Sequence, residues 1–172
     1  MPSGQPKETT NLDIYGHDSL PWSRARDQLV AGASKPGTSF FLATTRPDGR
    51  PHVAALGILW HEGDLYFQTG LGTRKARNLA ANPAASISVA LDGIDLVLEG
   101  DATVVDDVRK MQAVAAGFNK GGWPVEVKDG RLTAPYSAPT AGPPPWELYR
   151  FRFHTGFGVA TAEPHGGTRW RF

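Results

Sequence analysis

The sequence contains no cysteine in its 172 residues. Disulfide bonds, thiolate catalysis and cysteine metal sites are therefore all excluded. The sequence also lacks a run of about 18 apolar residues, the length that a membrane-spanning helix needs. The first residues do not contain the apolar core of a signal peptide. These absences favour a cytoplasmic protein without a membrane partner.

The sequence also has no large excess of positive or negative charge. It contains 18 Lys and Arg residues and 17 Asp and Glu residues, so the net charge is +1. Domains that bind nucleic acid are usually strongly basic, so no nucleic-acid partner is expected. The five histidines do not have metal-ligand spacing, and no Gly-x-Ser-x-Gly sequence marks a hydrolase nucleophile. The expected partner is a small molecule, and no metal site is predicted.

The length of 172 residues suits one domain with a substantial core and is too short for two. Residues 1–17 are polar and are expected to form a flexible arm. Residues 18–172 are expected to form the single domain. Within it, residues 117–145 are rich in proline and predict an irregular excursion that shapes a ligand pocket.

Hydrophobic periodicity predicts a mainly β, α+β fold. A first helix is expected from about Pro21 to Gly32, and two more helices are expected after the capping residues Thr73 and Asp107. Gly100 is expected at a bulge or a close backbone approach. Antiparallel hairpins with helices at their edges predict a small β-barrel with peripheral helices. The predicted strands cover residues 40–45, 50–60, 65–69, 86–91, 96–105, 149–153, 157–160 and 169–172.

The predicted strand over residues 50–60 is apolar on both of its alternating sets of side chains. A strand that is buried on two sides belongs either in a barrel wall or against a partner subunit. The pattern therefore favours a homodimer.

Residues 65–83 join an apolar strand, a glycine turn and a basic helix that Thr73 caps. Arg74, Lys75, Arg77 and Asn78 crowd the start of this helix. Cations there oppose the helix dipole, so their presence suits a bound anion such as a phosphate group. The alternative is a solvated basic face, since the glycines match neither the dinucleotide fingerprint nor a P-loop.

Five short pieces, in order, are TTRPDGRPH at 44–52, LYF at 65–67, TRKARNL at 73–79, NP at 82–83 and EG at 99–100. With these pieces, the sequence from about residue 38 to 105 resembles the pyridoxamine 5'-phosphate oxidase-like, split β-barrel flavoproteins. That superfamily includes FMN oxidases and deazaflavin-dependent reductases. The resemblance implies a split β-barrel of antiparallel strands, like that of FMN-binding proteins.

The resemblance also implies site residues. It assigns the phosphate of FMN to Thr73, Arg74 and Lys75, with Asn78 and Arg77 in support.

The sequence also departs from the family. The oxidases proper have an arginine and a lysine where this sequence has Ala54 and Leu59, and a glutamine where it has Asp95. The vitamin substrate of those enzymes is therefore not expected. The loss of two cations favours a deazaflavin as the alternative cofactor, whose binding members share the pattern of residues 75–79.

Two groups of residues are candidates for contact with the cofactor ring. His52, Val53, Ala54 and Ala55 are small or able to hydrogen-bond, although tight packing in the barrel wall explains them equally well. Trp170 is a candidate for stacking on the ring of a neighbouring subunit. The alternative explanation is that the alternating arginine and aromatic residues around Trp170 form an ordinary half-exposed edge strand.

Three functional hypotheses follow. The first is an FMN-dependent oxidoreductase that acts on an unidentified small conjugated substrate, with the cofactor near a homodimer interface. The second is a deazaflavin-dependent reductase. The third is a non-catalytic protein that binds a flavin, a deazaflavin or haem. The balance favours an enzyme, because a flavin performs hydride transfer itself and little acid–base machinery is then required of the protein.

Overall fold

The computed structural model describes residues 4–33 and 35–172, which form eleven strands and three helices. No helix among these residues has the length and apolar character needed to cross a membrane. The elements, in chain order, are β1 (Glu8–Asn11), α1 (Trp22–Ala33), β2 (Phe40–Thr45), β3 (Pro51–Leu56), β4 (Leu59–His61), β5 (Asp64–Thr69), α2 (Arg74–Ala81), β6 (Ala84–Leu91), β7 (Ile94–Val104), α3 (Val108–Lys120), β8 (Glu126–Lys128), β9 (Arg131–Thr133), β10 (Glu147–Ala160) and β11 (Gly167–Arg171).

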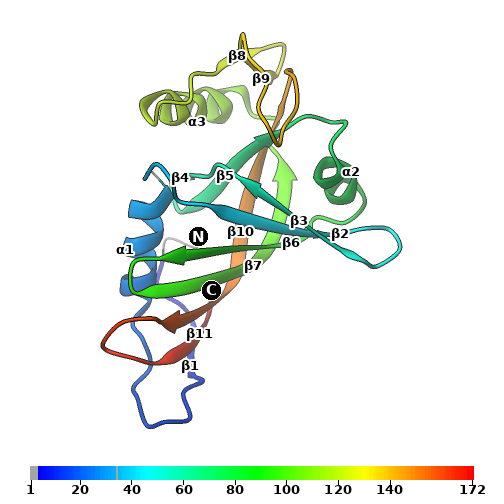
Figure 1. Ribbon diagram of the computed structural model, residues 1–172. Coiled ribbons are helices and arrows are strands. Elements are labelled where there is room, and N and C mark those ends of the chain that lie inside the picture. The colour runs from blue at the N-terminus through cyan, green and yellow to red at the C-terminus, as the bar shows by residue number, and fades with distance from the viewer. Residues whose placement is uncertain (1–3, 34) are drawn as a thin grey trace.

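Nine strands form one sheet with the order β1-β11-β10-β7-β6-β2-β3, and β5 joins β4 to β10. Its strand pairs are all antiparallel. The long strand β10 pairs with β7 along most of its length and with β5 near its start, so the sheet curls around a core. The helices α1, α2 and α3 lie outside it (Figure 1). The predicted split β-barrel with peripheral helices is thus confirmed.

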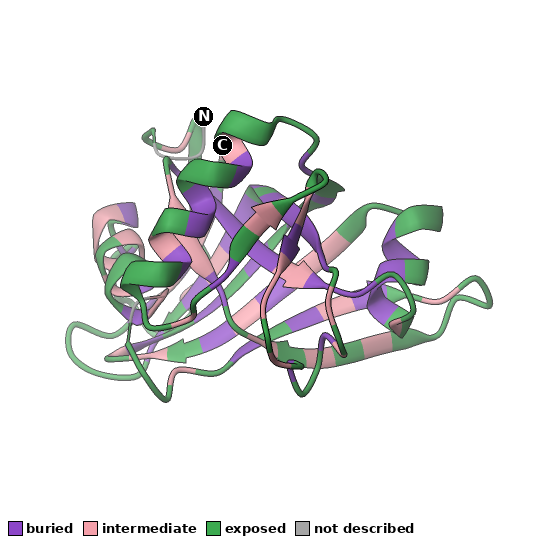
Figure 2. Cartoon of the chain, turned by 90° about the horizontal axis from the view of Figure 1, so that it is seen from above, coloured by how far each residue is buried: buried purple, intermediate pink, exposed green. Residues whose placement is uncertain are grey.

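The main core lies inside the curled sheet because side chains alternate along each strand. In β7, for example, Ile94, Leu96 and Leu98 are buried and the residues between them face outward. Helix α1, which the sequence predicted, covers one end of this core with buried side chains that include Trp22 and Leu29. Figure 2 shows buried residues along the inner faces of the strands and exposed residues on the outer faces of the helices.

A second, smaller core lies between α3 and the residues that follow it. Met111 and Val114 of α3 pack in one cluster with Leu132 and with Trp146, which is completely buried. The segment 117–145, expected to be irregular, contains the end of α3 and the hairpin of β8 and β9. The expectation was wrong at these elements because their short strands are held by the second core rather than by a strong local pattern.

Two other expectations are corrected. Residues Glu8–Asn11, within the expected flexible arm, form β1 and pair with β11. The strand expected over residues 50–60 is interrupted between β3 and β4. In the single chain β3 is also not buried on both sides, because it is the last strand of the sheet and Val53 is 57% exposed.

Gly100 confirms the expected close approach. A Cβ atom at this position would lie 2.1 Å from the Arg152 carbonyl oxygen, and the β7–β10 register shifts beside it. Only glycine fits between these strands.

Candidate functional site

The predicted strand-turn-helix is present and is fixed by hydrogen bonds. The Ala76 N–H donates to Thr73 Oγ1 over 3.3 Å, so Thr73 caps α2 as the sequence predicted. The hydroxyls of Thr69 and Thr73 lie 2.9 Å apart and link the end of β5 to the cap. The Gly70 N–H donates to the Ala141 carbonyl over 3.0 Å, and a Cβ atom on Gly70 would lie 2.6 Å from that oxygen. The glycine turn is therefore packed against the distant segment that precedes β10.

The cations of α2 point in different directions. Arg74 and Arg77 are exposed, and Arg77 donates to the Gly72 carbonyl over 2.9 Å. Lys75 is only 3% exposed, and its Nζ donates to the Thr140 carbonyl. Burial lowers the pKa of Lys75 because the ammonium group loses hydration. Lys75 thus ties the helix to the segment 117–145, a contact that its sequence pattern did not predict.

Asn78 attaches α2 to the barrel. It is fully buried, and its Nδ2 donates to Thr44 Oγ1 of β2 over 3.0 Å. Thr44 lies opposite His52 of β3 in the strand register. The side chains of α2, β2 and β3 therefore meet at one place on the barrel wall.

His52 lies within the electric field of three cations. Partial burial lowers the pKa of His52 first, and the positive charges of Arg46, Lys75 and Arg74 lower it further. Arg46 was not predicted as a site residue from the sequence. The feature that could have identified it is its position two residues after Thr44, because side chains two residues apart in extended chain lie on the same face.

This basic cluster has no acidic partner in the part of the chain that the structure describes. None of the ion pairs found there uses Arg46, Arg74, Lys75 or Arg77. No group of three possible metal ligands occurs among residues 4–33 and 35–172. The cluster can hold an anion, because its positive charge is not neutralised within the chain.

Helix α3 shows the opposite arrangement. Its cap is Asp107, whose carboxylate accepts from the N–H groups of Arg109 and Lys110. That carboxylate supplies the negative charge that a helix N-terminus prefers. In α2 the cap is the neutral Thr73, and no acidic residue is present in the first turn. An external anion at α2 would take the place that the Asp107 carboxylate has at α3.

The four candidate ring contacts on β3 divide between two faces. His52 and Ala54 are partly buried, whereas Val53 and Ala55 are exposed on the other face. Ala55 lies opposite Phe41 of β2, which is also exposed, so the outer face carries an apolar patch. One face of β3 thus lies toward the basic cluster and the other toward solvent.

Trp170 lies elsewhere. It is completely buried, its Nε1 donates to the Leu20 carbonyl over 3.1 Å, and its ring packs 5.4 Å from that of Trp22. The expectation that Trp170 stacks on a neighbouring subunit's ring does not fit this position, because no face of the indole reaches the surface. The alternation of arginine and aromatic residues on β11 reflects a strand with one buried face.

A cavity of about 820 Å³ lies beside the turn-helix unit. Gln68 of β5 and the residues Ala55 and Leu56 of β3 form part of its wall. Thr140, whose carbonyl holds Lys75, lines it as well. The segment 117–145 contributes Phe118 and Trp123, among others.

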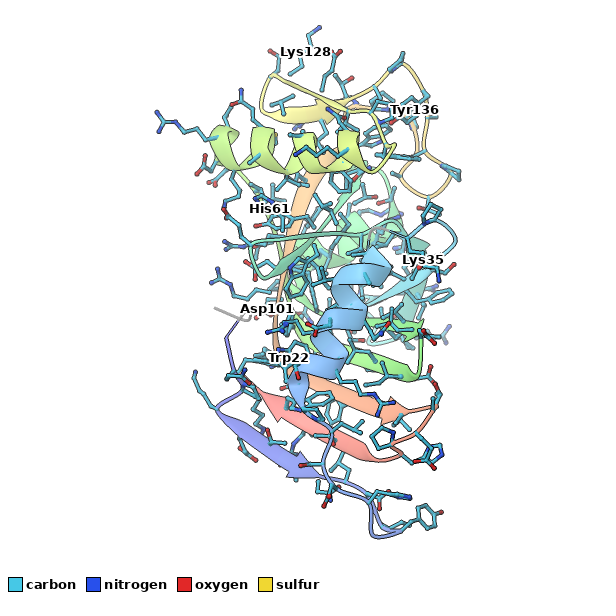
Figure 3. All side chains as sticks on the ribbon, turned by 90° about the vertical axis from the view of Figure 1, so that its left-hand side faces the viewer. Trp22, Lys35, His61, Asp101, Lys128 and Tyr136 are labelled. Atoms are coloured by element: carbon cyan, nitrogen blue, oxygen red, sulfur yellow. The ribbon has the colours of Figure 1, made fainter. Side chains whose placement is uncertain are left out.

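Lys35 also lines this cavity. In Figure 3 it lies at the end of α1, below the part of the segment 117–145 that contains Tyr136. The cavity is therefore lined by the segment that the sequence predicted to shape a pocket, and it is connected to the basic helix only through Thr140, the partner of Lys75.

A family model described as pyridoxamine 5'-phosphate oxidase matches residues 28–143, which is more than half of the chain. The match includes β2, β3, the glycine turn and α2. A search of curated protein sequences found no match.

Several solved structures have the same fold. One is an F420 reductase with 25% identity and a TM-score of 0.51, with coverage of 73% of this chain and 93% of that one. Another is an FMN-binding protein from Nostoc punctiforme related to pyridoxamine 5'-phosphate oxidase, with 22% identity, a TM-score of 0.58 and coverage of 86% and 89%. A third is a heme-binding protein from Mycobacterium smegmatis, with 17% identity, a TM-score of 0.59 and coverage of 86% and 58%.

Proposed function

Since the chain belongs to the pyridoxamine 5'-phosphate oxidase family, we propose that it binds FMN and acts as an oxidoreductase on a small conjugated substrate. Similar structures include an FMN-binding protein, an F420 reductase and a heme-binding protein, and this supports a cofactor ligand for the chain. The observation that carries the proposal is the unpaired basic cluster at the N-terminus of α2. It has the charge, the hydroxyl and the backbone donors that a phosphate group needs.

The phosphate site of this proposal is the start of α2. The first turn of a helix leaves N–H groups without acceptors inside the helix, and these point toward a bound anion. Arg74 and Arg77 add positive charge, Thr73 adds a hydroxyl, and Asn78 holds the helix against the barrel. The residues fit a phosphate group, because no carboxylate of the described chain competes for these cations.

The ring of the cofactor would lie along β3. His52 and Ala54 offer a small, partly buried surface on the face toward α2, whereas Val53 and Ala55 offer an exposed apolar one. A second copy of the chain that covers the exposed patch around Val53 and Phe41 would bury apolar surface. The proposal therefore includes a homodimer with the cofactor near its interface.

The 820 Å³ cavity is the proposed substrate pocket. When bound, FMN supplies the hydride chemistry, and the protein supplies binding, orientation and exclusion of water. Phe118 and Trp123 keep the pocket apolar, and Gln68 offers an amide for a hydrogen bond with a polar group of the substrate. Thr140 joins this wall to Lys75, so the pocket and the phosphate site share one structural unit.

A deazaflavin-dependent reductase is the second candidate. Two observations favour it, namely the absence of cations at Ala54 and Leu59 and the 25% identity to an F420 reductase. The phosphate site would be the same, and only the ring and the substrate would differ.

The test is to titrate the purified protein separately with FMN, F420 and haem and to record absorption spectra. The oxidoreductase proposal predicts that FMN or F420 binds, and that the bound cofactor is reduced by a donor and reoxidised by an acceptor. Preference for F420 would select the second candidate. Tight haem binding without affinity for FMN or F420 would contradict both candidates and support a non-catalytic carrier.

A further inference from the structure

We propose that Arg46, in the turn between β2 and β3, is a further phosphate-binding residue of the cofactor site. This inference rests on the proposed function and deepens it. Arg46 would supply positive charge to a site in which the neutral Ala54 and Leu59 stand where the related oxidases have an arginine and a lysine.

The strand geometry places Arg46 near the start of α2. Thr44 faces α2, because its hydroxyl accepts the hydrogen bond from Asn78. Arg46 is two residues further along, so its side chain leaves the backbone on the same side. His52 lies opposite Thr44 and is on this side as well. After the effect of burial, the positive charges of Arg46 and Arg74 both lower the pKa of His52, which agrees with this placement.

The backbone of the turn holds Arg46 in place. Its N–H donates to the Arg50 carbonyl over 2.9 Å, and its carbonyl accepts from the Gly49 N–H over 2.9 Å. Gly49 has a positive φ of 81°, which the tight turn requires. A guanidinium group on such a fixed turn needs little reorganisation before it binds a ligand.

The side chain of Arg46 has an unused donor. Its Nε is buried, and it has no hydrogen-bond partner among the residues that the structure describes. Buried donors are usually paired in folded proteins. Other unpaired donors occur in the described chain, such as Trp22 Nε1 and Arg169 Nε, but the Arg46 Nε belongs to the basic cluster around His52, where an anionic ligand would supply an acceptor. The planar guanidinium group matches a phosphate group with two parallel hydrogen bonds.

Lys75 does not meet this need. Its ammonium group is buried and donates to the Thr140 carbonyl, away from the exposed start of the helix. The cations that remain for the phosphate come from two elements, Arg46 from the β2–β3 turn and Arg74 with Arg77 from α2. We therefore assign Arg46 to the phosphate group together with the arginines of α2.

The experiment compares FMN with riboflavin, which has the same ring but no phosphate. The apoprotein and its Arg46→Gln variant are titrated with each ligand, and binding is followed by quenching of flavin fluorescence. The expected result is about a 10- to 100-fold loss of FMN affinity, the usual effect of removing a hydrogen bond to a charged group. The affinity for riboflavin should not change. If the wild-type protein binds only F420, its phosphate-free deazaflavin nucleoside replaces riboflavin.

Two further variants control the result. Arg50→Gln removes an exposed arginine from the other end of the same turn and should leave FMN affinity unchanged. Arg46→Lys keeps the charge but not the planar group, and its affinity should lie between those of the wild type and Arg46→Gln.

An Arg46→Gln protein that binds FMN like the wild type would overturn the inference alone. Equal losses for FMN and riboflavin would also overturn it, since they would indicate a structural effect. A wild-type protein that binds neither FMN nor F420 would overturn the proposed function, and the role of Arg46 with it.

Discussion

Two partly buried arginines at opposite ends of the barrel have opposite surroundings. Arg24 of α1 donates to three backbone carbonyls, those of Gly93, Ala162 and Pro164, at 2.5 to 2.9 Å. Arg46 has a buried Nε that has no partner in the described part of the chain. The division is not complete, because Trp22 Nε1 and Arg169 Nε on the Arg24 side are also buried without a partner among the described residues. What distinguishes the two ends is charge, since the Arg46 side carries a basic cluster without an acidic partner in the described chain. We call the two sides the Arg24 end and the proposed ligand end.

At the Arg24 end, several polar atoms are paired around aromatic side chains. Trp170 donates to the Leu20 carbonyl, and the Leu20 N–H donates to the Thr168 hydroxyl over 2.7 Å. At the other end the Asn78 Oδ1 is buried without a partner among the residues described. Unpaired buried atoms occur elsewhere in the described chain too, so they do not locate a site by themselves; at Arg46 and Asn78 they coincide with the basic cluster.

Among the substitutions that test this comparison, Trp170→Ala is expected to have the largest effect on stability. Removal of a fully buried indole leaves a large cavity, so the free energy of unfolding should fall by about 3 to 5 kcal/mol. Urea denaturation measures this loss. The fraction of protein that remains folded should bind FMN as the wild type does, and a selective loss of FMN affinity would contradict the separation of the two ends.

Arg74→Ala is the matching change at the proposed ligand end. FMN affinity should fall by about 10- to 100-fold, because a charged hydrogen-bond donor is lost. The free energy of unfolding should change by less than about 0.5 kcal/mol, as is usual for exposed side chains. Titration with FMN and urea denaturation measure the two quantities. Arg109→Ala, in the first turn of α3, is the control and should change neither.

A smaller effect is expected from Arg24→Ala. The three carbonyls that it serves would lose their donor, and the free energy of unfolding should fall by about 1 to 2 kcal/mol. Thermal and urea unfolding both detect a change of this size. FMN affinity should stay the same, and a weaker affinity would show that the two ends are coupled.

The smallest effect concerns His52. Its pKa in the folded chain lies below the unfolded value of 6.5, so the unfolded state binds the proton more readily. The stability contribution of neutral His52 is therefore present above pH 6.5 and is lost as the pH falls through the lowered pKa. In His52→Gln this part of the pH dependence should disappear, as measured by urea denaturation at several pH values.

The pKa of His52 should also respond to a bound ligand. A bound phosphate group would offset the charges of Arg46 and Arg74, so the pKa of His52 should rise when FMN is added. An NMR titration of the His52 ring in the free and FMN-loaded protein measures this change. A pKa that falls or stays constant would contradict a phosphate group at this position.

The sequence predicted the parts of the fold that depend on local rules. The capping role of Thr73 follows from its hydroxyl and the helix after it, and the tight fit at Gly100 follows from a glycine inside a strand pattern. The alternation of buried and exposed residues along β7 follows from the two-residue period of side chains in a strand. The Thr73 cap and the β7 alternation depend on residues that are close in the sequence. At Gly100 the glycine itself was the local signal, although the carbonyl that requires it belongs to the distant Arg152.

The remaining features depend on residues that are distant in the sequence. Trp170 is buried because α1 brings Trp22 against it, and the Lys75 ammonium group points inward, where it donates a hydrogen bond to the Thr140 carbonyl. Arg46 becomes a site candidate only when β2 is seen beneath α2. No local pattern contains these contacts, so the sequence predicted the basic helix but not which of its cations face a ligand.

The link between the glycine turn and the segment before β10 affects how the protein is made. Gly70 is held by Ala141, and Lys75 by Thr140, a residue 65 positions later. During synthesis the turn therefore emerges from the ribosome well before the residues that complete it. These contacts can form only after residues 140 and 141 have been synthesised, and closing so long a loop costs conformational entropy. If the proposed function is correct, a folding intermediate without this segment would lack the contacts that fix the cofactor site.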